Sequence, residues 1–299
     1  MVINVILPVM LVLLVGYIFG RFTDVDPSPI SKLAITVLSP ALIFSFLVRN
    51  SLSSKQMIQI VSSVLVFTLI MTILTIVIIK WTGNRSMLTP SLLSTVFPNT
   101  GNYGLPIVMF AYGESAFALS VVIVVINFIL MYSLGIYFAL LSGDSWKQAL
   151  RNIIKLPTSY ATMLAILVNL FSIEIPNFVY DPIKMVGQSM IPLALLLLGI
   201  QLSRTNLKGH LSATIISSAL KIIAAPIVIF AIVYTAGIDG TIAKVLILLN
   251  SMPTAVVMTI IAAEYKSGAD MVANVTLLTT LTSFFSITTL LYLLNIIYG

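Results

Sequence analysis

The sequence predicts an all-α polytopic membrane protein with ten transmembrane helices, arranged as two inverted five-helix repeats. Three observations predict this class: the composition, the spacing of the apolar segments and an internal similarity between the two halves. Of the 299 residues, 59% are hydrophobic and 8% are charged. A soluble domain carries about 25% charged residues, so most of this chain is expected to lie in a lipid bilayer.

The side chains that are missing exclude several kinds of site. There is no cysteine, which rules out a disulfide, a thiolate metal site and a cysteine nucleophile. The single histidine, His210, cannot form a multi-histidine zinc site. We therefore expect no metal and no cofactor. The net charge of +6 follows from the loops, as described below, and does not indicate a nucleic-acid partner.

Apolar segments of spanning length follow one another along the whole chain. A helix needs about 20 mostly apolar residues to cross a bilayer. Division at the charged and turn-rich stretches predicts spans at about residues 3–20, 30–48, 57–80, 89–111, 115–141, 152–172, 183–202, 209–235, 241–263 and 269–297. The first segment has neither a basic start nor a cleavage pattern, so it is expected to be a span rather than a removable signal peptide.

The distribution of lysine and arginine predicts the orientation, because these residues are enriched in cytoplasmic loops. Ten of them follow the odd-numbered spans: Arg21, Lys32, Lys80, Arg85, Lys147, Arg151, Lys155, Arg204, Lys208 and Lys266. Four lie on the other side: Arg49, Lys55, Lys184 and Lys244. We therefore expect a multi-pass protein of the cell membrane with both termini extracytoplasmic.

Prolines recur at equivalent places in the two halves, which predicts an internal repeat. The matched pairs are Pro98 and Pro253, Pro40 and Pro192, and Pro8 and Pro157. The expected units are residues 1–143 and 144–299. Because each unit has an odd number of spans, the second must enter the bilayer from the opposite side. Inverted repeats of this kind are typical of secondary transporters.

The fourth predicted span is interrupted by "FPNTGNYGLPIV", residues 97–108. Pro98 removes a backbone donor and frees carbonyls near residue 94, while Gly101 and Gly104 permit unusual backbone angles. Such a break survives in a membrane only where protein or water satisfies the backbone. The break is expected to give two half-helices, and a free helix N-terminus suits a carboxylate. A plain proline kink is the alternative, above all at Pro253.

Polar side chains surround both expected breaks and form the candidate substrate site. If the fourth and ninth spans cross at mid-membrane, their positive ends converge on one place. A lysine inside the eighth span is expected to attract an anion or to stand in for a bound cation, because a charge at that depth is costly. The alternatives are a lysine that snorkels along the helix and one satisfied by backbone carbonyls in the bundle. The candidate residues are Pro98, Asn99, Thr100, Asn102, Asn250, Ser251, Pro253, Thr254 and Lys221.

No acidic residue falls at the middle of a predicted span, so we expect uncoupled or exchange transport rather than proton coupling. The chain also lacks the HExxH-type pair and the buried aspartate pair of intramembrane proteases, so it is not expected to be an enzyme. An anion channel or a membrane sensor that uses the same crossing is the alternative to a transporter. A channel is disfavoured because the polar residues gather at two breaks rather than along a continuous face.

The motif "PNTGNYGLPI", the proline-broken ninth span and the ten-span layout resemble the auxin efflux carrier family, which includes the plant PIN proteins and bacterial malate and malonate permeases. The resemblance covers essentially the whole chain. It implies that spans 4 and 9 cross at the site of a small organic anion. It also implies a scaffold of spans 1, 2, 6 and 7, a mobile transport unit of spans 3–5 and 8–10 with elevator-type movement, and a homodimer. The long cytoplasmic loop of the plant members is absent here.

Overall fold

The protein is described by a computed structural model that covers residues 2–49, 53–140, 157–204 and 209–298. These residues form helices and no named strand, which confirms the all-α prediction. Seven helical segments are long and apolar enough to cross a membrane, and two further apolar helices are shorter. The predicted boundary between residues 143 and 144, and the loop cations Lys147, Arg151, Lys155 and Lys208, lie outside the described residues.

The helices follow the predicted segments closely. The first half holds α1 (Val2–Phe22), α2 (Ser28–Leu33), the π-helical segment η1 (Ala34–Leu38), α3 (Ser39–Arg49), α4 (Ser54–Trp81), a 3-10 turn η2 (Arg85–Met87), α5 (Leu88–Val96), the π-helical η3 (Thr100–Gly104), α6 (Leu105–Leu130), the π-helical η4 (Met131–Gly135) and α7 (Ile136–Ala139). The second half holds α9 (Pro157–Leu170), α10 (Asn177–Gln188), α11 (Met190–Ser203), α12 (Leu211–Ala219), the π-helical η5 (Leu220–Ala224), α13 (Ala225–Thr235), α14 (Gly240–Asn250), α15 (Val256–Glu264) and α16 (Ala269–Tyr298).

A glycine divides the longest helical stretch, which runs over Thr100–Ala139. Gly113 has φ 76° and ψ −168°, so the direction of the chain changes inside α6. A side chain would disfavour this positive φ, and glycine has none. The change of direction falls between the fourth and fifth predicted spans, at residues 89–111 and 115–141.

Two of the π-helical segments stand two residues before a proline. η1 precedes Pro40, and η5 precedes Pro226. A proline ring clashes with the carbonyl four residues earlier and has no N–H to give it. A locally wider turn relieves this conflict without ending the helix, which is why single π-turns persist inside α-helices.

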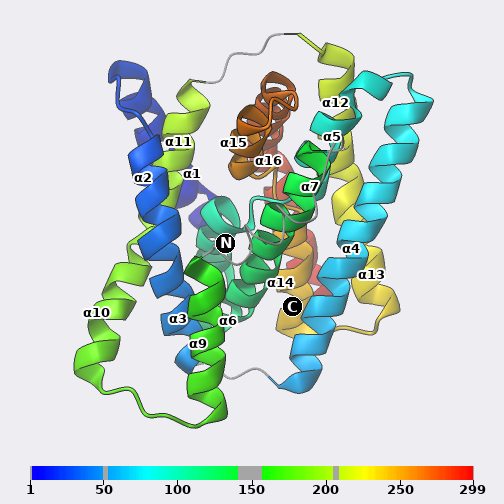
Figure 1. Ribbon diagram of the computed structural model, residues 1–299. Helices are drawn as coiled ribbons and strands as arrows, with labels where there is room; N and C mark the ends of the chain where they lie inside the picture. Colours follow the sequence, from blue (N-terminus) through cyan, green and yellow to red (C-terminus); the bar gives the residue numbers. More distant parts are fainter. Residues whose placement is uncertain (1, 50–52, 141–156, 205–208, 299) are drawn as a thin grey trace.

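One group of helices packs through glycines that let two backbones touch. A Cβ atom added at Gly199 of α11 would lie 2.1 Å from the carbonyl oxygen of Leu13 in α1, and one at Gly16 would lie 2.2 Å from that of Leu196. Gly187 of α10 meets the backbone of α3 in the same way, at 2.6 Å. Figure 1 shows α1, α2, α3, α10 and α11 together on one side of the molecule. Small residues at close helix contacts are typical of membrane bundles. The helix α9 packs against α3 of this first group.

The helices α4 to α7 and α12 to α16 form a second group around a large apolar core, which extends to α1 and α11. The helix α4 packs against α5, α13 and α14, while α16 packs against α5, α12, α14 and α15. In Figure 1 α4, α5, α12 and α13 lie opposite the first group, with α6, α14, α15 and α16 between. Phe67, Met71, Leu246 and Leu249 are completely buried in this core. The candidate functional site lies where the two groups meet.

Candidate functional site

The helical path stops at the motif that the sequence singled out. α5 ends at Val96, and Phe97 has extended angles of φ −101° and ψ 109°. Helical structure resumes at Thr100, the first residue of η3. In the second half α14 ends at Asn250, and α15 begins only at Val256. Both interruptions lie deep in the protein.

The two interruptions are hydrogen-bonded to each other. The N–H of Asn99 donates to the carbonyl of Pro253 over 2.8 Å, and the N–H of Ala255 donates to the carbonyl of Phe97 over 3.1 Å. These bonds form a single antiparallel bridge. Segments about 155 residues apart in the sequence thus satisfy each other's backbone groups, as a buried chain break requires.

The carbonyl freed by Pro98 has a side-chain donor. In a regular helix the carbonyl of Ser94 would accept from the N–H of residue 98, which proline lacks. The hydroxyl of Thr254 donates to that carbonyl over 2.6 Å. Both Ser94 and Thr254 are completely buried, so no water can replace this bond.

A Thr254→Val substitution should therefore destabilise the protein, whereas Thr254→Ser should not. Valine keeps the shape but leaves the carbonyl of Ser94 unpaired, and an unmet buried acceptor costs about 1–3 kcal/mol. Serine keeps the donor. Thermal unfolding of the three proteins in the same detergent measures the difference. Equal midpoints for wild type and Thr254→Val would show that the bond contributes nothing to stability.

Lys221 satisfies the next carbonyl along α5. The carbonyl of Thr95 would accept the N–H of Asn99 in a regular helix, but Asn99 donates to Pro253 instead. The ammonium of Lys221 donates to the carbonyl of Thr95 over 3.1 Å. A positive charge is favourable at the C-terminal end of a helix, where the dipole is negative.

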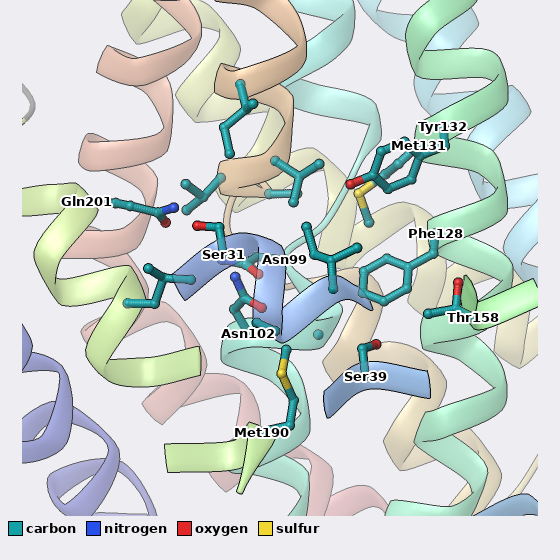
Figure 2. A pocket seen from close by; sticks show the side chains of 18 residues that line it. Ser31, Ser39, Asn99, Asn102, Phe128, Met131, Tyr132, Thr158, Met190 and Gln201 are labelled. Atoms are coloured by element: carbon teal, nitrogen blue, oxygen red, sulfur yellow. The ribbon is translucent and has the colours of Figure 1, made fainter. Parts of the chain in front are cut away.

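A pocket lies on the other side of the bridge, toward α2, η1 and α11. It contains about 640 Å³ of empty space, part of it open to solvent. Its walls are Ser31, Ala34, Ile35, Ser39, Asn99, Gly101, Asn102, Phe128, Met131, Tyr132, Thr158, Met190, Leu197, Gln201, Ala255, Val256, Val257 and Ile260. Figure 2 shows Asn99 and Asn102 in the middle of the pocket, with Gln201 on one side and Phe128 and Tyr132 on the other.

The pocket faces two helix N-termini, one from each half of the chain. Asn99, Gly101 and Asn102 belong to the start of η3, and Ala255 and Val256 belong to the start of α15. The first amide groups of a helix have no acceptor within it and carry a partial positive charge. Two such ends directed at one pocket favour a negatively charged group there.

The side chain of Asn99 adds an unused donor to this wall. Only 4% of Asn99 is exposed, and its amide nitrogen Nδ2 has no hydrogen-bond partner. A buried polar group without a partner is rare in native structures and requires an explanation. A ligand that accepts a hydrogen bond inside the pocket would provide one. No group of three or more metal-ligating side chains occurs among the described residues.

A second cavity of about 1180 Å³ adjoins the pocket and shares Ser31, Tyr132 and Gln201 with it. It continues to Arg204 and Glu264 at one end of the molecule. Arg204 donates to the carbonyl of Val25 and thereby holds the loop before α2.

The same loop carries the negatively charged carboxylate of Asp26, close to Arg204 at the end of the second cavity. The backbone N–H and the hydroxyl of Ser28 donate to the carboxylate of Asp26 over 2.9 and 2.7 Å. Together with the nearby Arg204, these bonds lower the pKa of Asp26, because they stabilise the charged form.

The structure separates the predicted site residues into two sets. Asn99 and Asn102 line the pocket, whereas the other seven do not: Pro98, Thr100, Lys221, Asn250, Ser251, Pro253 and Thr254. The seven support the bridge or the helix ends behind it. The amide of Asn250, for instance, donates to the carbonyl of Leu246 over 2.8 Å, within its own helix.

Several pocket residues escape sequence reasoning. In the sequence, Gln201 has nothing to distinguish it from the many polar residues that form hydrogen bonds between membrane helices, and Ser31, Ser39 and Thr158 belong to no motif. The apolar walls were also indistinguishable from core residues. One structural signal marks the site afterwards: η1, η3 and η4 each contribute residues to the pocket, and π-turns are frequent at functional sites.

Comparison with known proteins identifies the family of this chain. Residues 1–292 match the family described as membrane transport protein. The chain is 26% identical over 289 residues to the uncharacterized transporter MJ1031 of Methanocaldococcus jannaschii, with 93% of this chain and 94% of the relative covered. It is 22% identical over 290 residues to an uncharacterized transporter of Methanothermobacter thermautotrophicus, with 94% and 95% covered. The chain therefore belongs to the membrane transport protein family, that of the auxin efflux carriers, and is a membrane transporter.

Proposed function

We propose that this transporter is a secondary carrier for a small organic anion, whose carboxylate binds where η3 and α15 begin. The observation that carries the proposal is the pocket wall itself. It combines two helix N-termini with the unpartnered amide of Asn99. Amide N–H groups at helix ends bind anions without a charged side chain, and their hydrogen bonds to a carboxylate are stronger than those to a neutral acceptor.

The walls favour a monocarboxylate with an apolar body. Among the described residues, no lysine, arginine or histidine lines the pocket, so a second carboxylate would enter a low-polarity space without a partner. Phe128, Met131, Met190 and Leu197 offer apolar contact instead. A dicarboxylate such as malate therefore fits the pocket less well than a singly charged acid.

The ten-span, inverted-repeat arrangement belongs to the same proposal. The stretch Thr100–Ala139 has 40 residues, about twice the length of one span, and turns at Gly113. The interrupted pairs α5–η3 and α14–α15 then each count as one span with a break, and α9 completes the set. In this interpretation, the bridge joins the breaks of two inverted units.

Elevator-type movement is proposed on the basis of the packing. The scaffold would consist of α1, α2, α3, α9, α10 and α11. Backbone contacts at glycines join α1 to α11 and α3 to α10, and α9 packs against α3. The transport unit would carry α4 to α7 and α12 to α16. The pocket lies between the two, with Ser31 and Gln201 on the scaffold and Asn99 and Val257 on the transport unit. Sliding of one against the other would carry the site across the membrane.

We also propose that the described conformation opens to the cytoplasm. The second cavity leads from the pocket to Arg204 and Glu264, which lie on the side that the lysine and arginine distribution assigns to the cytoplasm. Both termini would then be extracytoplasmic in the cell membrane. A homodimer remains part of the proposal through the family resemblance alone.

Counterflow in proteoliposomes tests the proposed function. Vesicles are loaded with unlabelled benzoate, diluted into labelled benzoate, and compared with vesicles that contain and receive malate. We expect transient accumulation of benzoate above its equilibrium level and much weaker accumulation of malate. A carrier shows this trans-stimulation, whereas a channel only equilibrates. Equilibration without overshoot for both acids would contradict the proposal.

A further inference from the structure

Lys221 is the only charged side chain that is buried among the residues the structure describes, and it is completely buried. It lies near the middle of the helical stretch Leu211–Thr235. Among the residues that the structure describes, no carboxylate lies within 4.0 Å of its ammonium. The ammonium contacts the carbonyl of Thr95 and lies 5.9 Å from the ring centre of Phe67. Its charge is therefore not paired with a carboxylate of any described residue.

Neutral hydroxyl groups connect the helices around Lys221. The hydroxyls of Thr75 and Thr95 are 2.8 Å apart, and the hydroxyl of Ser217 donates to that of Ser91 over 3.1 Å. All four residues are completely buried. This cluster fixes α4, α5 and α12 against one another and provides a polar surrounding, but it adds no negative charge.

Lys221 is attached to the same bridge as the pocket. Its hydrogen bond ends on Thr95, four residues before Asn99, and Asn99 both joins the bridge and lines the pocket. The cation lies at the C-terminal end of α5, and the pocket lies at the N-terminal ends of η3 and α15. Both would therefore move together in any displacement of the transport unit.

We propose that Lys221 is the resident counter-charge of the transported monoanion, so that the loaded transport unit is electrically neutral. This inference rests on the proposed function. An isolated charge is costly in an apolar interior, and binding a singly charged anion beside the same bridge compensates it. The loaded unit then crosses without net charge, while the empty unit carries one positive charge. Because Lys221 supplies a single positive charge, it also favours a monoanion over a dianion.

Tracer exchange at imposed membrane potentials tests the assignment. Proteoliposomes with equal benzoate on both sides receive a hundredfold potassium gradient and valinomycin. The wild type should exchange at the same rate with and without the potential. Lys221→Gln retains a donor for the carbonyl of Thr95 but loses the charge. Its loaded unit carries one negative charge, and exchange should slow by up to about fivefold, because the potential then favours one side. Lys221→Arg should behave like the wild type.

The outcomes separate this inference from the proposed function. The counter-charge role alone would be overturned by either of two results. In one, the imposed potential slows exchange by the wild type; in the other, it does not slow exchange by Lys221→Gln. Absence of benzoate exchange in the wild type would overturn the proposed function and this inference with it. If Lys221→Gln does not fold, Lys221→Met is measured in its place with the same expected voltage dependence. Failure of both neutral variants to fold, together with a folded Lys221→Arg, would overturn the counter-charge role in favour of a structural one.

Discussion

An Asn99→Ala transporter should lose transport while remaining at least as stable as the wild type. The amide of Asn99 faces the pocket and has no hydrogen-bond partner in the protein. Removal of this amide therefore breaks no hydrogen bond from Nδ2 within the protein, and it removes a buried donor that has no acceptor. A hydrogen bond to a charged group contributes about 1.5–3 kcal/mol, so affinity for the anion should fall more than about tenfold.

Asn127→Ala is the matched control for this substitution. Asn127, in α6, is also a buried asparagine, but its amide donates to the carbonyl of Ile123 over 3.0 Å and it does not line the pocket. We expect this variant to lose stability and to keep its affinity for benzoate. Counterflow rates and thermal midpoints of both variants give the two readouts. Unchanged counterflow by Asn99→Ala would remove Asn99 from the binding site.

The opposite signs of these two effects follow from one physical difference. Functional groups that wait for a ligand are commonly unsatisfied in the free protein, so their removal costs function and not stability. Structural groups are already paired. The presence or absence of a hydrogen-bond partner for the buried amide thus separates the two asparagines, which the sequence alone does not.

Much of the architecture could be predicted because hydrophobic length and proline position are local properties. The described helices lie at the expected segments, and the freed carbonyl expected near residue 94 is that of Ser94. Pro98 made this visible because its missing N–H identifies which acceptor loses its donor. The sequence analysis also named Thr254, the distant partner of that carbonyl, but as a candidate substrate-binding residue rather than as this hydrogen-bond donor.

The candidate site was harder to predict because side-chain direction depends on tertiary packing. Thr100 and Asn102 look equivalent in the sequence, yet only Asn102 lines the pocket. Gln201 resembles any membrane asparagine or glutamine that bonds a neighbouring helix. Lys221 was expected near the anion or satisfied by carbonyls, and the structure shows the carbonyl contact. Its proposed influence on the anion acts through charge rather than through contact.

A reversible cross-link across the cavity should abolish transport, because the proposed mechanism requires its two walls to slide. Ser31 in α2 and Val257 in α15 line both the pocket and the adjoining cavity from the two groups of helices. The chain has no cysteine, so Ser31→Cys with Val257→Cys gives a single pair of thiols. A bifunctional methanethiosulfonate reagent should reduce counterflow to the level of protein-free vesicles, and reductant should restore it.

Two controls separate lost movement from simple blockage. Ser31→Cys alone, treated with a monofunctional reagent of equal length, fills the cavity without joining its walls and should retain measurable counterflow. Leu47→Cys with Asn169→Cys joins α3 to α9, where the amide of Asn169 already donates to the carbonyl of Leu47 over 2.8 Å. Because both helices belong to the proposed scaffold, this link should leave counterflow intact. Equal inhibition by both linked pairs would mean that the two groups are not separate rigid bodies. Full activity with the cavity linked would show that the anion crosses without any sliding of α15 past α2.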